Sequence, residues 1–164
     1  MISNPKSKPL KAFFHNKELF SAKKIDKDQK IISRLVITDR YKILLPDYGN
    51  IEINLPPLHK SFYILMLRYP EGIRFKELSN FRNELIEIYK HVGNRSDIDQ
   101  IKKSITELTD NRSNSVNEKC SRIKAAFLLH MEDAIAQNYY ISGSRSQPKR
   151  IKLQSDLIQF YQKP

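Results

Sequence analysis

The proline pair Pro56–Pro57 most constrains the fold of this 164-residue chain, because the pattern of apolar residues changes there. Residues 31–55 hold short β-branched or alternating runs, separated by turn-forming segments at 38–40 and 46–50. Beyond the prolines, apolar residues recur at helical spacing, at Leu58, Phe62, Leu65 and Met66. Proline has no amide hydrogen, so it ends a sheet and suits the first position of a helix. We therefore expect a small antiparallel sheet of three strands, followed by a helix from Pro57.

Three more segments show helical periodicity. One starts near Lys76 and ends at Gly93, and a second follows Asp97, whose side chain we expect to cap it. The third, over about 115–128, begins with Ser115-Val116-Asn117-Glu118, a capping-box pattern in which hydroxyl and carboxylate each bond an orphan amide.

Two short strands around a polar tip at residues 138–154 then predict a β-hairpin. The expected fold class is α+β, with the N-terminal antiparallel β-sheet at 31–55, three to four helices over 57–131 and the hairpin last. This order is that of a winged helix-turn-helix, in which the last helix enters the major groove and the C-terminal β-hairpin is the wing. We expect one such domain over residues 31–154.

The net charge of +11 is unevenly distributed. Residues 1–30 carry +5, residues 31–110 carry +1, residues 111–154 carry +5, and the C-terminal tail at 155–164 is neutral. Concentrated positive charge favours phosphate binding, because each neutralised phosphate releases counterions. The alternative is that these segments only keep the protein soluble. The composition of residues 1–30, rich in Lys, Ser, Asn and Pro, is typical of a basic, partly flexible arm.

The expected helix at 115–128 has two chemically distinct faces. Its apolar stripe consists of Val116, Cys120, Ile123 and Phe127. Its outward positions carry amide, hydroxyl and cationic groups, which can meet base edges and phosphates. These candidate DNA contacts are Asn117, Lys119, Ser121, Arg122 and Lys124, with Asn114 just ahead of the helix.

The hairpin adds a second basic surface. With Ile151 and Leu153 inward, strand alternation turns Arg150 and Lys152 outward. Arg145 at the tip and Lys149 complete the candidate contacts to a DNA backbone or minor groove. The competing interpretation is a solvated helix face and a charged hairpin that prevents edge-to-edge association.

Several motifs also resemble a known family. Leu55-Pro56-Pro57-Leu58, the stretch from Tyr69 to Leu78, the helix from Val116 to Phe127 and Tyr140-Ile141-Ser142-Gly143 are similar to the OmpR-type winged-helix output domain of bacterial response regulators. The resemblance covers Leu55 to Leu153 and implies DNA binding through a recognition helix and a wing. The patterns RYPEGIRFKEL, NSVNEKCSRIKAAF and NYYISGSRSQPKRIKL are more closely similar to a group of uncharacterised proteins from Bacteroidetes bacteria. Two features differ from the response regulators: we expect no receiver domain within residues 1–30, and an extra helical segment is expected at residues 97–108.

Nothing in the sequence indicates an enzyme, a cofactor or a metal site. None of the four histidines has a cysteine or carboxylate at the spacing typical of metal ligands. The four glycines occur singly and far apart, so they do not form a phosphate-binding loop. A single cysteine and the lack of a long apolar run favour a cytoplasmic protein without a membrane segment. We expect a non-enzymatic DNA-binding module, a transcriptional regulator that binds double-stranded DNA. The alternative is a winged-helix module for protein contacts, with a homodimer or another protein as partner.

Overall fold

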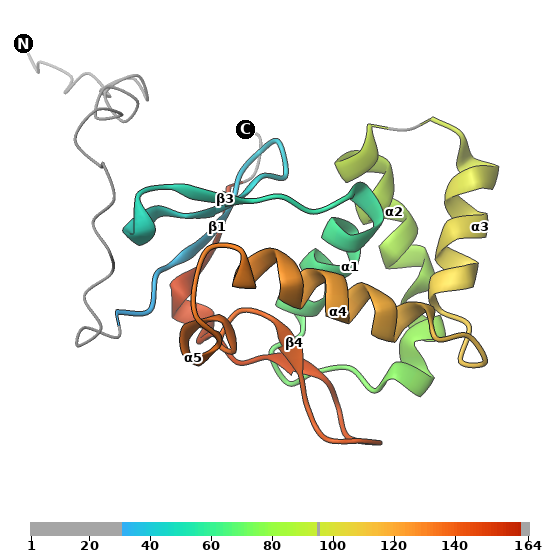
Figure 1. Ribbon diagram of the computed structural model, residues 1–164. Helices are drawn as coiled ribbons and strands as arrows, with labels where there is room; N and C mark the ends of the chain where they lie inside the picture. The colour runs from blue at the N-terminus through green and yellow to red at the C-terminus, as the bar shows by residue number, and fades with distance from the viewer. Residues whose placement is uncertain (1–30, 95, 162–164) are drawn as a thin grey trace, which may run out of the picture. The chain divides into compact units, whose positions relative to one another are not determined.

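The structure is a computed structural model that describes residues 31–94 and 96–161 (Figure 1). The expected basic arm at 1–30 lies outside the described residues. Within the described residues the architecture is α+β, as predicted, with a four-stranded sheet, a two-stranded hairpin and five α-helices. The helices are α1 (Pro57–Arg68), α2 (Arg82–Gly93), α3 (Ile98–Leu108), α4 (Ser115–Leu128) and α5 (Asp133–Ala136), with 3-10 turns η2 (Pro46–Tyr48), η3 (Phe75–Phe81) and η4 (Ser155–Leu157).

The sheet has one strand more than the sequence predicted. Its strands are β1 (Leu35–Ile37), β2 (Ile43–Leu45), β3 (Ile51–Ile53) and β6 (Ile158–Phe160), in the order β3-β2-β1-β6. The first three pair antiparallel, as expected. Strand β6 pairs in parallel with β1, with Val36 opposite Gln159. The segment expected as a C-terminal tail therefore supplies, in its described part, an edge of the sheet.

Local signals located most helices correctly. Pro57 is the first residue of α1, and the Asp97 side chain caps α3 by accepting a hydrogen bond from the Gln100 amide at 3.0 Å. The helix expected from Lys76 instead starts as the 3-10 turn η3 and becomes α-helical only at Arg82.

The predicted capping box at the start of α4 is wrong. Asn114 is the N-cap residue, and no side chain caps the helix. Ser115 lies within the first turn, where its amide donates to the Ser113 hydroxyl at 3.3 Å. The Glu118 carboxylate turns instead to the cations of α4 itself, at 3.1 Å from Arg122 and 3.9 Å from Lys119.

Helix α1 is the centre of the core, because its residues from Phe62 to Met66 are at most 1 % exposed. The Tyr63 hydroxyl donates to the Tyr139 carbonyl at 2.7 Å, and the Tyr139 hydroxyl donates to the Ser33 carbonyl at 2.9 Å. The Phe127 ring of α4 lies 5.6 Å from each of the two tyrosine rings. Burying these rings with their hydroxyls satisfied joins α1, α4, the segment before the hairpin and the start of β1.

The hairpin consists of β4 (Ile141–Ser142) and β5 (Arg150–Ile151), which pair antiparallel as predicted. A further antiparallel bridge joins Lys149 to Ile73, in the link between α1 and η3. Gly72 makes this close approach possible, because a Cβ there would lie 2.7 Å from the Lys149 carbonyl oxygen. Its φ of +93° is also one that glycine adopts at little cost. The base of the hairpin is thus held against the helical body.

Candidate nucleic-acid interface

Helix α4 packs against strand β4, so the two elements that the sequence marked as basic are neighbours. In Figure 1, α4 (orange) crosses the front of the molecule, and the hairpin projects below it. The apolar side of α4 is buried as expected, with Ile123 and Phe127 fully covered. Cys120 lies on the same side, and burial raises the pKa of its thiol to about 12. The thiol is therefore protonated at neutral pH and is a poor nucleophile.

The first turns of α4 present amide and hydroxyl groups. Asn114, Asn117 and Ser121 are exposed. The Asn117 amide donates to the Asn114 side-chain oxygen at 2.9 Å, and the Ser121 hydroxyl donates to the Asn117 carbonyl at 3.1 Å. These three side chains form a polar strip that keeps further hydrogen-bonding capacity toward solvent.

Two cations of α4 already have partners: Arg122, which is exposed, and Lys124, which is partly exposed. Arg122, with a side chain 65 % exposed, lies 3.1 Å from Glu118 one turn earlier. The Lys124 ammonium lies 3.2 Å from the Asp133 carboxylate and 4.6 Å from the centre of the Tyr140 ring. Tyr140 and Asp133 together raise the pKa of Lys124. Both cations would have to share or exchange these partners to meet a phosphate.

Lys119 does not face outward, contrary to the prediction from the sequence. Its side chain is only 14 % exposed, and its charge acts on the buried ring of His59 in α1. Lys119 lies at the flank of α4 next to α1, where the tertiary packing covers it. The helical periodicity of α4 alone could not show this.

The hairpin cations differ from those of α4. Arg145, Arg150 and Lys152 are exposed, whereas Ile151 and Leu153 are 5 % exposed, as the predicted alternation requires. Within residues 31–94 and 96–161, no ion pair or hydrogen bond involves the side chains of these three cations. Lys149 is the exception in this hairpin, because its ammonium donates to the carbonyl oxygens of Gly143 and Ser144, the latter at 2.7 Å. Lys149 therefore links the two sides of the hairpin loop.

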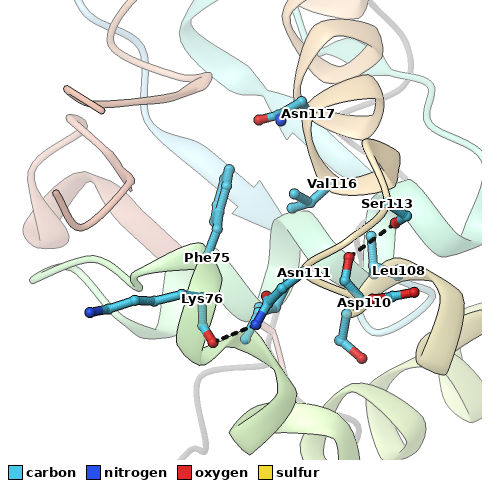
Figure 2. Close-up of a pocket in the computed structure, with 10 residues that line it drawn as sticks. Phe75, Lys76, Leu108, Asp110, Asn111, Ser113, Val116 and Asn117 are labelled. Atoms are coloured by element: carbon cyan, nitrogen blue, oxygen red, sulfur yellow. Dashed lines mark hydrogen bonds between the residues drawn. The ribbon is translucent and has the colours of Figure 1, made fainter. Parts of the chain in front are cut away.

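A hollow of about 170 Å³ lies beside the first turn of α4 (Figure 2). Its apolar lining includes Phe75, Leu108 and Val116, and Asn117 stands at its edge. Lys76 of η3 also lines the hollow: its backbone carbonyl accepts a hydrogen bond from the Asn111 side-chain amide at 3.0 Å, and its ammonium group points away from the hollow in Figure 2. Reasoning from the sequence missed this place of Lys76 beside the start of α4, because a contact between distant segments brings it there.

Other kinds of site find little support in the described part of the chain. No group of three His, Cys, Asp or Glu side chains there is placed to hold a metal ion. None of the helices described is both long and apolar enough to cross a membrane. Comparison of the chain with models of protein families, with curated proteins and with solved structures gave no match. The resemblance to OmpR-type domains therefore stays a prediction.

Proposed function

We propose that the protein is a DNA-binding module of the winged-helix type and regulates transcription. In this proposal α4 is the recognition helix in the major groove, and the hairpin β4–β5 is the wing on the backbone or minor groove. The observation that carries the proposal is a set of three exposed cations, Arg145, Arg150 and Lys152, which have no partner among the described residues and lie on a hairpin whose base is bridged to the body. Cations that already lack a partner attract phosphates without first breaking an ion pair.

The arrangement of the elements supports the winged-helix assignment. The link between α1 and η3 pairs with the hairpin through Ile73 and Lys149, and α4 packs on both α1 and β4. A short extended link, two or more helices and a hairpin beside the last long helix are the parts that such a motif needs.

The surface of α4 is better suited to hydrogen bonds with base edges than to electrostatic attraction of phosphates. Its exposed Asn117 and Ser121 are able to donate to and accept from base edges, while Arg122 and Lys124 are balanced by carboxylates. In this division of labour the wing supplies sequence-independent attraction and α4 supplies the discrimination between sequences.

One observation favours a second candidate, a module for protein contacts. Leu129, just after α4, is 82 % exposed, and Leu128 is 40 % exposed. Exposed leucines at the end of a helix are suited to a protein surface, although single exposed apolar residues are common.

The test is the salt dependence of binding to a duplex of mixed sequence, measured by fluorescence anisotropy. Wild type should bind at low salt, and its affinity should fall linearly with the logarithm of the salt concentration. Replacing both Arg145 and Arg150 by Ala should lower the slope by about 2, because two phosphate contacts are lost. The matched control replaces Lys102 and Lys103, two exposed lysines of α3, and should leave the slope near that of wild type.

No binding at low salt would exclude DNA as the partner. An equal loss of slope in the wing and α3 variants would show that only total charge matters. The second candidate would be favoured if the protein does not bind DNA but forms an oligomer, and if Leu129→Lys makes that oligomer dissociate.

A further inference from the structure

A second and larger hollow lies away from the proposed DNA interface. It has a volume of about 600 Å³, within the range of small-molecule sites. Its lining comes from the end of β1, the β1–β2 turn, the ends of α1 and α2, and the end of β6 with the residue after it: Ile37, Thr38, Asp39, Tyr41, Arg68, His91, Phe160 and Tyr161. None of these residues belongs to α4 or to the hairpin.

Tyrosine and phenylalanine rings line this hollow together with the imidazole of His91, whose centre lies 6.4 Å from that of the Tyr41 ring. Tyr41 is half-buried, whereas Phe160 and Tyr161 are 42 % and 60 % exposed. The floor includes Ile37, which is 2 % exposed. A planar ligand placed between these rings would remove aromatic surface from water and gain stacking contacts.

Two opposite charges line the same hollow without pairing to each other. Arg68 gives one N–H group to Glu84 at 2.9 Å, so the remaining guanidinium donors have capacity for another acceptor. Asp39 is exposed, and across the described ranges its carboxylate has no ion pair. A ligand that carries both an anionic and a cationic group is able to satisfy both.

The backbone at Tyr41 is held in an unusual conformation. Its φ is +57°, a left-handed value that is rare for a bulky residue and costs about 1 kcal/mol or more. Hydrogen bonds from the Tyr41 amide to the Thr38 carbonyl at 2.9 Å and from the Thr38 amide to the Lys42 carbonyl at 3.0 Å keep the turn closed. Three-residue hairpin loops commonly end in a residue of this conformation, so the closed turn fixes where Tyr41 lies in the lining of the hollow.

We propose that this hollow binds a free aromatic amino acid. The ring lies against Tyr41, Phe160 and Tyr161, the carboxylate accepts from Arg68, and the ammonium group donates to Asp39. A nucleotide fits less well, because its phosphate is able to accept from Arg68 but the nucleotide has no cationic group for Asp39. A quaternary ammonium compound would meet Arg68, and a purely apolar ligand would leave both charged groups without new partners. The site does not depend on DNA binding by the wing and α4.

The protein allows a direct test, because it contains no tryptophan. L-Tryptophan is titrated with the full chain in the absence of DNA, and the indole emission is followed under selective excitation. We expect a saturable change. Tryptamine, which lacks the carboxylate, and indole-3-propionate, which lacks the ammonium group, should each bind about tenfold more weakly, and calorimetry should detect still weaker binding of L-leucine.

A variant series assigns the charged contact. Asp39→Asn should weaken tryptophan binding about tenfold and leave indole-3-propionate unchanged, while Asp99→Asn, at an exposed carboxylate of α3, should change neither. Tyr161→Ala should weaken all three indole ligands. The absence of a saturable signal with wild type, equal binding of the four ligands, or equal behaviour of the two aspartate variants would overturn the proposal.

Discussion

Helix α4 and the hairpin carry similar numbers of cations but differ in what those cations contact. In α4, Arg122 is paired with Glu118, and Lys124 with Asp133. In the hairpin, residues 141–153 contain no aspartate or glutamate, so its outward cations have no nearby acid to pair with. The positive charge of a segment, counted along the sequence, is therefore not the charge that it offers to a partner. Four predictions test this difference.

The largest effect should come from separating the hairpin from the body. Gly72→Ala brings a Cβ to within 2.7 Å of the Lys149 carbonyl oxygen at a φ of +93°, so the bridge to the hairpin has to open or strain. We expect the free energy of unfolding to fall by roughly 2–4 kcal/mol in urea titrations. The control is Gly49→Ala, whose φ is +76° but whose Cβ would meet nothing within 4 Å, and which should cost roughly 1 kcal/mol. Equal losses would mean that contact with the hairpin is unimportant for stability.

The next prediction concerns how α4 is anchored to α1. His59 is 8 % exposed, and neither ring nitrogen has a hydrogen-bond partner in the part of the chain that the structure describes. Burial, and then the charges of Lys119 and Arg122, lower the pKa of His59 below its ordinary 6.5. Below pH 6.5, His59 binds a proton more readily in the unfolded chain than in the folded protein. The free energy of unfolding is therefore highest above that pH and decreases as the pH falls. Denaturant titrations between neutral pH and pH 5 should show this loss.

A His59→Leu variant should lose much of that pH dependence, while His130→Gln, at an exposed histidine, should retain it. If both histidine variants behave like wild type, the destabilisation at low pH arises elsewhere.

A smaller effect is expected from replacing Lys149, whose role should differ from that of the outward cations of the hairpin. Its ammonium binds two carbonyl oxygens of the hairpin, so Lys149→Met should loosen the wing and weaken DNA binding about three- to tenfold. Because no phosphate contact is lost, the salt slope should stay unchanged. Arg150→Ala, in contrast, should lower that slope by about 1. A drop of slope for Lys149→Met would place its charge on the DNA instead.

The smallest effect should come from making α4 more like the hairpin. Glu118→Gln frees Arg122 from an exposed helical ion pair worth only about 0.3–0.5 kcal/mol. The salt slope should become steeper by up to about 1, with a slight gain in affinity. Glu107→Gln, which removes an exposed carboxylate of α3 that has no ion pair in the described ranges, should leave the slope unchanged. If both variants change the slope equally, the carboxylate beside Arg122 has no special role.

The sequence predicts those features that depend on neighbours in the chain. Pro57 starts α1 and Asp97 caps α3, because a missing amide hydrogen and a short acceptor act within one turn. The alternation around Ile151 likewise follows from strand geometry. Features that depend on tertiary contacts were not predictable. The Glu118 carboxylate pairs with Arg122 and Lys119 of its own helix and does not cap the helix start. The Lys119 side chain is largely covered at the flank of α4.

The candidate site shows the same limit. The three outward cations of the hairpin were located from the sequence, but the place of Lys76 beside the segment before α4 depends on a contact between distant segments. The three residues of β6 are too few to display a period, and their partner strand is far away in the chain.

That parallel pair, Leu35 with Ile158, has a kinetic consequence. Contacts so distant in sequence require the closure of a very long loop, whose entropy is lost before any strand contact compensates for it. The adjacent helices α1, α2 and α3 can associate without that loss. We therefore expect β6 to join after the rate-limiting step of folding, so that weakening its contacts speeds unfolding and hardly changes the folding rate. The contacts of β6 would then determine how long the protein stays folded, with little influence on how fast it folds.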